Sequence, residues 1–161
     1  AFFLSRLRGN SVEIIHVETP NTGVSFLRPG LGKRPLHACS CSKAVAAFSP
    51  DLFLASDLDG RLRAYTEFTL ATVCDLEAEF EVIRKRGFAE CVEEIERGLC
   101  SVAAPLSSSG LGAAMSIGAA GSLRIFTPDF REKLGIKLIQ ISKQISFNLG
   151  WEGSGDLRVS V

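Results

Sequence analysis

Thiol and imidazole groups gather in one short stretch of the chain. Cys39 and Cys41 flank Ser40, and His37 lies two residues before Cys39. Together with the distant Cys91, these side chains are of the types that bind zinc or copper. A C-x-C pair is a weak signal, because structural zinc sites usually carry two regular pairs and free cysteines commonly pack as small apolar side chains. The sequence therefore favours no metal and no cofactor, and the alternative is zinc at His37, Cys39, Cys41 and Cys91.

The same stretch lies at the start of a predicted helix. Ser40, Cys41 and Ser42 would supply backbone N–H groups without intrahelical partners, which favour a bound anion. A cysteine in such a position can also have a lowered pKa and respond to oxidation. A redox sensor is therefore a further alternative function.

Two serines on predicted strands could add hydroxyl donors. Ser101 and Ser116 lie in segments that a turn at 107–110 would pair. If both side chains point inward, they would line a pocket with donors and no fixed charge, suited to a small carboxylate. The alternative is that both are ordinary strand serines.

The remaining polar residues suggest no catalytic site. The acidic run with Glu93, Glu94 and Glu96 is more typical of a solvated edge than of a catalytic cluster, and His16 is expected to be structural or on the surface. No G-x-S-x-G, P-loop or G-x-G-x-x-G pattern occurs. An enzyme with a cysteine nucleophile would need a base beside Cys41 or Cys91, so the sequence favours a protein that is not an enzyme.

Helices and strands that could position these groups follow from hydrophobic periodicity and turn residues. Strands are expected at 2–8, 11–19 and 24–28, with a turn at Gly9-Asn10 and a loop at 29–35. Helices are expected at 43–48, at 51–56, from Asp75 to Gly87, and from Thr127 to Gly150 with an apolar stripe. Further strands are expected at 88–95, 100–107 and 112–119. Strands on both sides of a helical segment indicate an α+β domain with an antiparallel sheet.

Composition limits the function classes. The 161 residues suit one domain, and the 18 basic and 18 acidic residues cancel, which argues against nucleic-acid binding by this chain itself. No apolar run is long enough for a transmembrane helix, and the first residues do not resemble a signal peptide. Five cysteines without regular spacing suggest reduced thiols in a cytoplasmic protein.

Three segments in register resemble the effector-binding domain of the IclR family of bacterial transcription regulators. The first runs from Arg34-Pro35-Leu36-His37-Ala38 to Phe48, the second from Arg84-Lys85-Arg86-Gly87-Phe88-Ala89 to Val102-Ala103-Ala104-Pro105, and the third is Ala113-Ala114-Met115-Ser116-Ile117. The resemblance spans essentially residues 1–150, the expected effector-binding domain, and leaves 151–161 as a C-terminal tail.

The resemblance implies a GAF-like fold, in which helices flank a curved antiparallel sheet. It implies a sensor of a small metabolite, often a carboxylic or aromatic acid, without membrane contact. DNA binding would belong to an N-terminal winged helix-turn-helix domain absent from this chain, and the regulator would be a homodimer or homotetramer.

Ligand positions carried over from the family fall on six residues: Phe26, Ser40, Cys41, Cys91, Ser101 and Ser116. Among the departures from the family pattern, Ser42 replaces a glycine, Cys91 replaces an acid, Ser101 replaces a cysteine and Gly118 replaces a serine. With the acid gone and Arg28 expected nearby, an anionic ligand becomes easier to bind.

Overall fold

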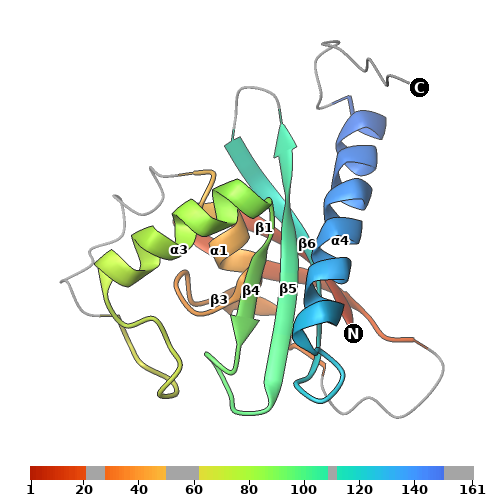
Figure 1. Ribbon diagram of the computed structural model, residues 1–161. Coiled ribbons are helices and arrows are strands. Elements are labelled where there is room, and N and C mark those ends of the chain that lie inside the picture. The colour runs from red at the N-terminus through yellow and green to blue at the C-terminus, as the bar shows by residue number, and fades with distance from the viewer. Residues whose placement is uncertain (21–27, 50–61, 109–111, 151–161) are drawn as a thin grey trace.

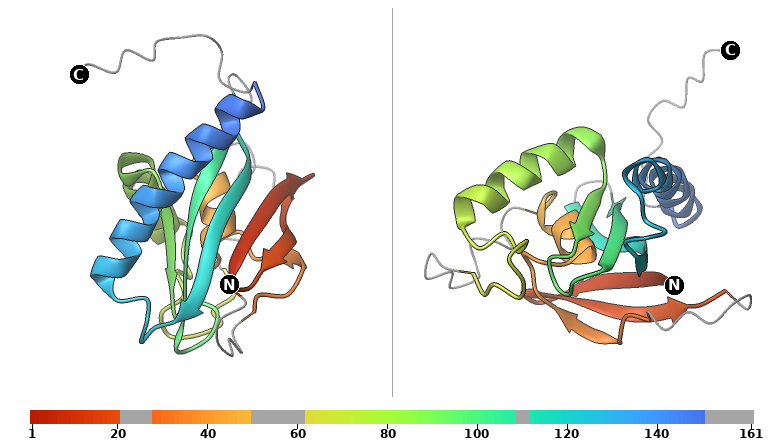
Figure 2. Two further views of the ribbon diagram at one scale, coloured as in Figure 1. Left: turned by 90° about the vertical axis from the view of Figure 1, so that its right-hand side faces the viewer. Right: turned by 60° about the horizontal axis from the view of Figure 1, so that its bottom comes forward.

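One antiparallel sheet organises the part of the chain that the computed structural model describes, residues 1–20, 28–49, 62–108 and 112–150. The strand order is β3-β2-β1-β6-β5-β4 (Figure 1). The sheet curves around helix α1, and helix α4 lies on its other face (Figure 2). The elements are β1 (Phe2–Arg8), β2 (Ser11–Glu18), β3 (Gly32–Arg34), α1 (Ser40–Ala46), α3 (Val73–Arg86), β4 (Ala89–Val92), β5 (Leu99–Ser108), β6 (Gly112–Ser122) and α4 (Pro128–Asn148). This arrangement confirms the α+β prediction.

Two predicted hairpins form the centre of the sheet. β1 and β2 pair from Phe2 with Glu18 to Arg8 with Ser11, and Gly9 takes the positive φ of 57° that the turn needs. β5 and β6 pair along their whole length up to Ser108 with Gly112. Ser107 and Ser108, predicted as turn residues, are therefore strand residues, and 109–111 lie outside the described part of the chain.

The third strand differs from the prediction. Residues 24–27 of the expected strand lie outside the described residues, and Arg28 is not in a strand. Instead, Gly32–Arg34, in the expected loop, pairs with Val12–Ile14 of β2. Backbone hydrogen bonds to an existing sheet edge decide this placement, and a Gly- and Pro-rich sequence gives little local sign of it. The expected helix at 51–56 and the tail at 151–161 also lie outside the described residues.

Helix α3 begins three residues before the predicted start. Thr72, not Asp75, is the N-cap, and its hydroxyl accepts a hydrogen bond from the Asp75 backbone N–H at 3.1 Å. The predicted end is confirmed, because Gly87 adopts a left-handed φ of 85° and its N–H donates to Ile83.

The core is divided between the two faces of the sheet. Apolar residues of β1, β2, α1 and α3 pack on the concave face, including Phe3, Val45 and Phe80. A second cluster under α4 includes Phe88 and Leu138. The concave cluster thus positions α1 and the thiol-containing stretch against the sheet.

Helix α4 faces the sheet through smaller residues than predicted. Of the expected apolar stripe, only Leu138 is buried, and the other buried positions are Gly135, Ser142 and Ser146. Gly135 lies so close to the Phe88 ring that a Cβ would come within 2.6 Å of it. Close approach to the sheet requires small side chains, which hydrophobic periodicity does not detect. Within the described residues, no helix has the length and apolar character needed to cross a membrane.

Candidate functional site

A cavity of about 340 Å³ lies between α1, the sheet and the loop that follows β4. This volume is within the range of pockets for small organic ligands, roughly 300–1,000 Å³. Its apolar wall includes Phe3, Ile14, Leu99 and Ala120. Its polar residues are Arg28, Arg34, Cys39, Ser40, Cys41, Cys91, Glu96 and Ser101.

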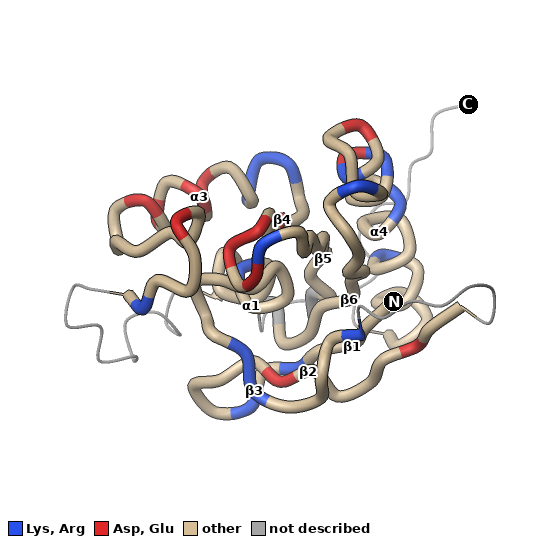
Figure 3. The backbone as a smooth tube through the Cα atoms, turned by 90° about the horizontal axis from the view of Figure 1, so that it is seen from below, with Lys and Arg blue, Asp and Glu red and all other residues tan. Residues whose placement is uncertain are grey.

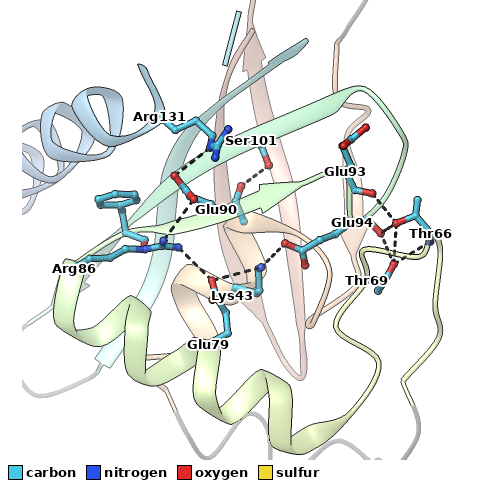
Figure 4. Close-up of polar contacts among 12 residues, drawn as sticks. Lys43, Thr66, Thr69, Glu79, Arg86, Glu90, Glu93, Glu94, Ser101 and Arg131 are labelled. Carbon is cyan, nitrogen blue, oxygen red and sulfur yellow. Dashed lines mark hydrogen bonds and ion pairs between the residues drawn. The ribbon is translucent and has the colours of Figure 1, made fainter. Parts of the chain in front are cut away.

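Four of the six residues predicted from the family line this cavity together: Ser40, Cys41, Cys91 and Ser101. The Ser40 and Ser101 hydroxyls lie 2.7 Å apart, which joins α1 to β5 (Figure 4). Cys91 is the register partner of Ser101 on the neighbouring strand. Phe26 lies outside the described residues.

Ser116, the sixth predicted residue, lies beneath α1 and is not among the residues lining the cavity. Its hydroxyl is completely buried, 2.6 Å from the Ser5 hydroxyl, and donates to the Cys41 carbonyl at 3.2 Å. These bonds hold α1 on the sheet from below, while Ser40 and Ser101 meet at the edge of the cavity.

Arg34 brings positive charge to the cavity. One of its terminal nitrogens donates to the Gly30 carbonyl, while its buried Nε has no hydrogen-bond partner among the residues that the structure describes. Unpaired buried donors are uncommon, because losing water without gaining an acceptor is unfavourable. Arg28, expected near the ligand, also lines the cavity. Arg34 was not among the residues predicted from the sequence, although a cation directly before the Pro-Leu-His segment was a visible signal.

The thiols in the cavity differ in acidity. Hydrogen bonding from Cys39 lowers the pKa of Cys41 against the opposing effect of burial, with help from Ser42 and the charge of Arg34. The hydrogen bond and burial raise the pKa of Cys39 well above its usual value. Burial, with a smaller effect of Glu94, raises the pKa of Cys91 to about 11. Cys41 is therefore the most acidic of the three thiols.

Glu94, in the acidic run after β4, forms a buried ion pair that was not predicted from the sequence. Glu94, expected on a solvated edge, accepts from Lys43 of α1 at 2.7 Å, and Lys43 is the largest completely buried side chain. Figure 3 shows this acidic loop against α1. Burial raises the pKa of Glu94 despite the opposing attraction of Lys43. A lysine among alanines and a valine in α1 was the available signal, because such a position is otherwise apolar.

The ion pair continues into a chain of charges. Lys43 Nζ also lies 3.8 Å from a carboxylate oxygen of Glu79 on α3. The Arg86 guanidinium lies between two carboxylates, 3.2 Å from Glu79 and 3.5 Å from Glu90 of β4. Arg131 of α4 then reaches Glu90 at 3.3 Å (Figure 4). The wall of the cavity is thereby connected to both long helices.

Two threonines hold the backbone of the same loop. Thr66 donates to the Glu93 carbonyl at 2.7 Å, and Thr69 donates to the Glu94 carbonyl at 2.6 Å. Glu93 itself has a positive φ of 57°, where the strand predicted for 88–95 has already ended. The loop that carries Glu94, Ile95 and Glu96 past the cavity is thus fixed at several points.

The metal alternative gains no support from the arrangement of side chains. Among the described residues, no group of three or more His, Cys, Asp or Glu side chains could hold a metal ion. His37 directs Nε2 at the Arg63 carbonyl, 2.8 Å away, and its ring stacks on Tyr65. His16 is exposed beside Glu18, as expected for a surface residue.

For the cysteine-nucleophile alternative, no general base contacts Cys41 among the residues that the structure describes. The hydrogen-bond partners of its thiol are the Cys39 thiol and the Ser42 hydroxyl. Neither group is a general base near neutral pH.

The known proteins that this chain resembles in sequence are transcription regulators of one family. The family model for the C-terminal domain of bacterial transcriptional regulators of the IclR type matches residues 2–147. The chain is 29% identical over 130 residues to the glycerol operon regulatory protein of Streptomyces griseus, which covers 80% of the chain and 50% of that protein. The chain therefore spans half the length of this relative.

Solved structures show the same fold. The IclR protein of Thermotoga maritima superposes with a TM-score of 0.80 at 24% identity, over 93% of this chain and 61% of that one. The inducer binding domain of an Acinetobacter PobR double mutant, in complex with 3-hydroxybenzoic acid, superposes with a TM-score of 0.76 at 16% identity, over 92% and 87% of the two chains.

Proposed function

This chain belongs to the IclR family of bacterial transcriptional regulators as a C-terminal domain, and from that premise we propose that its cavity binds a small organic acid as the effector. The Acinetobacter relative was solved with an aromatic acid, which makes a carboxylate the first class of compound to test. The similar proteins are named as transcription regulators rather than as enzymes. A sensor of this kind needs no catalytic group.

The observation that carries the proposal is the buried Nε of Arg34, a residue in the wall of the cavity, for which the described part of the chain offers no acceptor. A carboxylate would give this N–H an acceptor and place its charge beside the guanidinium. Helix α1 has only seven residues, so the dipole of its first turn adds little. The side chains of Arg34, Ser40 and Ser101 are therefore the main polar contacts proposed for the acid group.

Binding regulates transcription only if the acid has different affinities for two states of the whole regulator. We propose that the whole regulator binds operator DNA through a separate domain, in the cytoplasm, as a homodimer or homotetramer. Figure 3 shows Lys and Arg interspersed with Asp and Glu over the described elements, as suits a domain that does not itself bind DNA. Apolar side chains exposed on α4, such as Phe130, Ile136 and Phe147, support an oligomer contact there.

Isothermal titration calorimetry with benzoate, 3-hydroxybenzoate and succinate, against the uncharged benzamide and benzyl alcohol, tests the proposal. We expect binding of at least one acid, and Arg34→Gln should weaken it by roughly tenfold or more, since a charged hydrogen bond is lost. Arg124→Gln is the matched control, because Arg124 is exposed on the turn before α4, away from the cavity. Binding of only the uncharged compounds, or an Arg34→Gln variant with unchanged affinity, would refute the proposal.

A further inference from the structure

Three of the five cysteines face one cavity. Cys39 is the N-cap of α1, Cys41 lies in its first turn, and Cys91 lies on β4 across the cavity. The other two lie elsewhere, since Cys74 is exposed on α3 and Cys100 packs in the core under α4. A small reagent that enters the cavity therefore meets the half-buried Cys39 and the buried Cys41 and Cys91.

Cys39 and Cys41 both line the cavity, one as the N-cap of α1 and the other in its first turn, and hydrogen bonding from Cys39 is the largest cause of the lowered pKa of Cys41. The Cys41 sulfur also lies 3.9 Å from the Ser42 hydroxyl and feels the charge of Arg34. These groups stabilise a thiolate on Cys41, and they account for the lowered pKa of this residue. At Cys91, burial and the charge of Glu94 disfavour the thiolate and outweigh the opposite effects of Lys43 and Ser101.

We propose that Cys41 is oxidised by a small hydroperoxide entering the cavity, and that Cys39 then closes a Cys39–Cys41 disulfide. In the first step the Cys41 thiolate attacks the peroxide ROOH, the O–O bond breaks, and with one proton the products are a Cys41 sulfenic acid and ROH. In the second step the Cys39 sulfur attacks the Cys41 sulfur, the S–O bond breaks, and water leaves with the Cys39 proton. Two thiols are oxidised and one hydroperoxide is reduced.

The spacing of the two cysteines is compatible with this disulfide. Residues two apart have Cα atoms no more than about 7 Å from each other, and disulfides usually join Cα atoms about 4.4–6.8 Å apart. Cys39 is the N-cap of α1, with an extended φ of −113° and ψ of 139°, and its side chain makes no capping hydrogen bond. Ser40, between the two cysteines, holds Ser101, and closing the ring would disturb that contact.

The relative rates of the thiols follow from their acidity. The pKa of Cys41 is lowered and that of Cys91 is raised, so the thiolate fraction of Cys41 is the larger of the two. The lower nucleophilicity of the more acidic thiol reduces this advantage without cancelling it. We therefore expect Cys41 to be consumed faster than Cys91.

The test treats the chain carrying Cys74→Ser, which removes the exposed thiol, with tert-butyl hydroperoxide at pH 8. Free thiols are then alkylated in denaturant, and peptides are mapped by mass spectrometry. We expect a peptide that is two hydrogens lighter, linking Cys39 to Cys41, while Cys91 and Cys100 remain alkylated. With Cys39→Ser added, oxidation should stop at a Cys41 sulfenic acid that dimedone traps.

Oxidation of Cys91 or Cys100 as fast as Cys41 would overturn the proposal, as would a disulfide from Cys41 to Cys91 or no oxidation of Cys41. The mapping does not depend on the Cys39→Ser variant, so it remains decisive if that variant fails to fold. Because the readout needs no effector, its outcome is independent of whether the cavity binds an organic acid.

Discussion

The Nζ atom of Lys43 lies 2.7 Å from Oε1 of Glu94, with the two side chains only 1% and 9% exposed. The pair joins α1 to the loop that carries Ile95 and Glu96 along the cavity. Glu94 Oε2, in contrast, is buried and has no hydrogen-bond partner within the described residues. A buried ion pair with one oxygen unsatisfied is costly to desolvate, so its place beside a cavity suggests a role in holding the cavity's shape.

Removing Lys43 should destabilise the domain strongly. Lys43→Met leaves Glu94 buried without its cation, and we expect the free energy of unfolding to fall by about 3–5 kcal/mol. Adding Glu94→Gln to this variant should recover part of the loss, because no uncompensated charge remains. Urea denaturation measures both changes.

The control for this experiment is Glu81→Gln, which breaks a surface pair with Arg84 where the Glu81 side chain is 62% exposed. An exposed pair contributes about 0–1 kcal/mol. A Lys43→Met variant that loses no more stability than Glu81→Gln would contradict the assigned importance of the buried pair.

The Glu94 carboxyl should give stability a particular pH dependence. Its pKa is raised in the folded domain by burial, above the usual 4.5, although Lys43 opposes this and Glu79 is also nearby. A raised carboxyl pKa contributes stability that is complete below pH 4.5 and is lost as the pH rises through the folded value. The free energy of unfolding of the native chain, minus that of Glu94→Gln, should therefore decrease from pH 4.5 to pH 7. Urea titrations at several pH values measure this difference, and an increase with pH would show the opposite shift.

Substitutions of Ser116 and Ser101 should have different effects, the first mainly on the stability of the domain and the second mainly on its affinity for the ligand. Ser116→Ala removes a buried hydroxyl that bonds Ser5 and Cys41, so we expect a loss of about 1 kcal/mol in unfolding free energy. Ser101→Ala removes a cavity hydroxyl and should weaken carboxylate binding. Denaturation and calorimetry on both variants check the pair, and a larger loss of affinity for Ser116→Ala would return Ser116 to the ligand site.

Gly135 should be intolerant of alanine despite lying within a helix. A Cβ there would lie 2.6 Å from atoms of the Phe88 ring, and the Arg86 guanidinium stacks 4.8 Å from the centre of that ring. Overpacking costs about 1–3 kcal/mol, which exceeds the gain in helix propensity of up to about 1 kcal/mol. Thermal unfolding should show a lower melting temperature for Gly135→Ala, whereas Gln140→Ala, at an exposed position of α4, should have little effect. A melting temperature of Gly135→Ala that is equal to or above that of the native chain would contradict the prediction, because α4 would then move away from Phe88 without cost.

Patterns with a local cause were predicted well. Gly9-Asn10 and the β-branched run at 11–18 specify a hairpin, Gly87 ends α3, and Thr127 with Pro128 starts α4. Each depends on residues within a few positions of one another. The predictions failed where partners lie far apart in the chain, as for β3 on the edge of β2 and for the face of α4 that packs on Phe88.

The order of predicted helices and strands determined the α+β class, and the resemblance of three segments to the IclR family placed Ser40, Cys41, Cys91 and Ser101 among the candidates. Only the tertiary structure decided that these four share one cavity, that Ser116 supports α1 from beneath, and that Arg34 brings an unpaired donor to the cavity. The pairing of Lys43 with Glu94, 51 residues later in the chain, depended on it as well. Whether a charge is buried, and beside what, depends on long-range packing, which local sequence patterns do not encode.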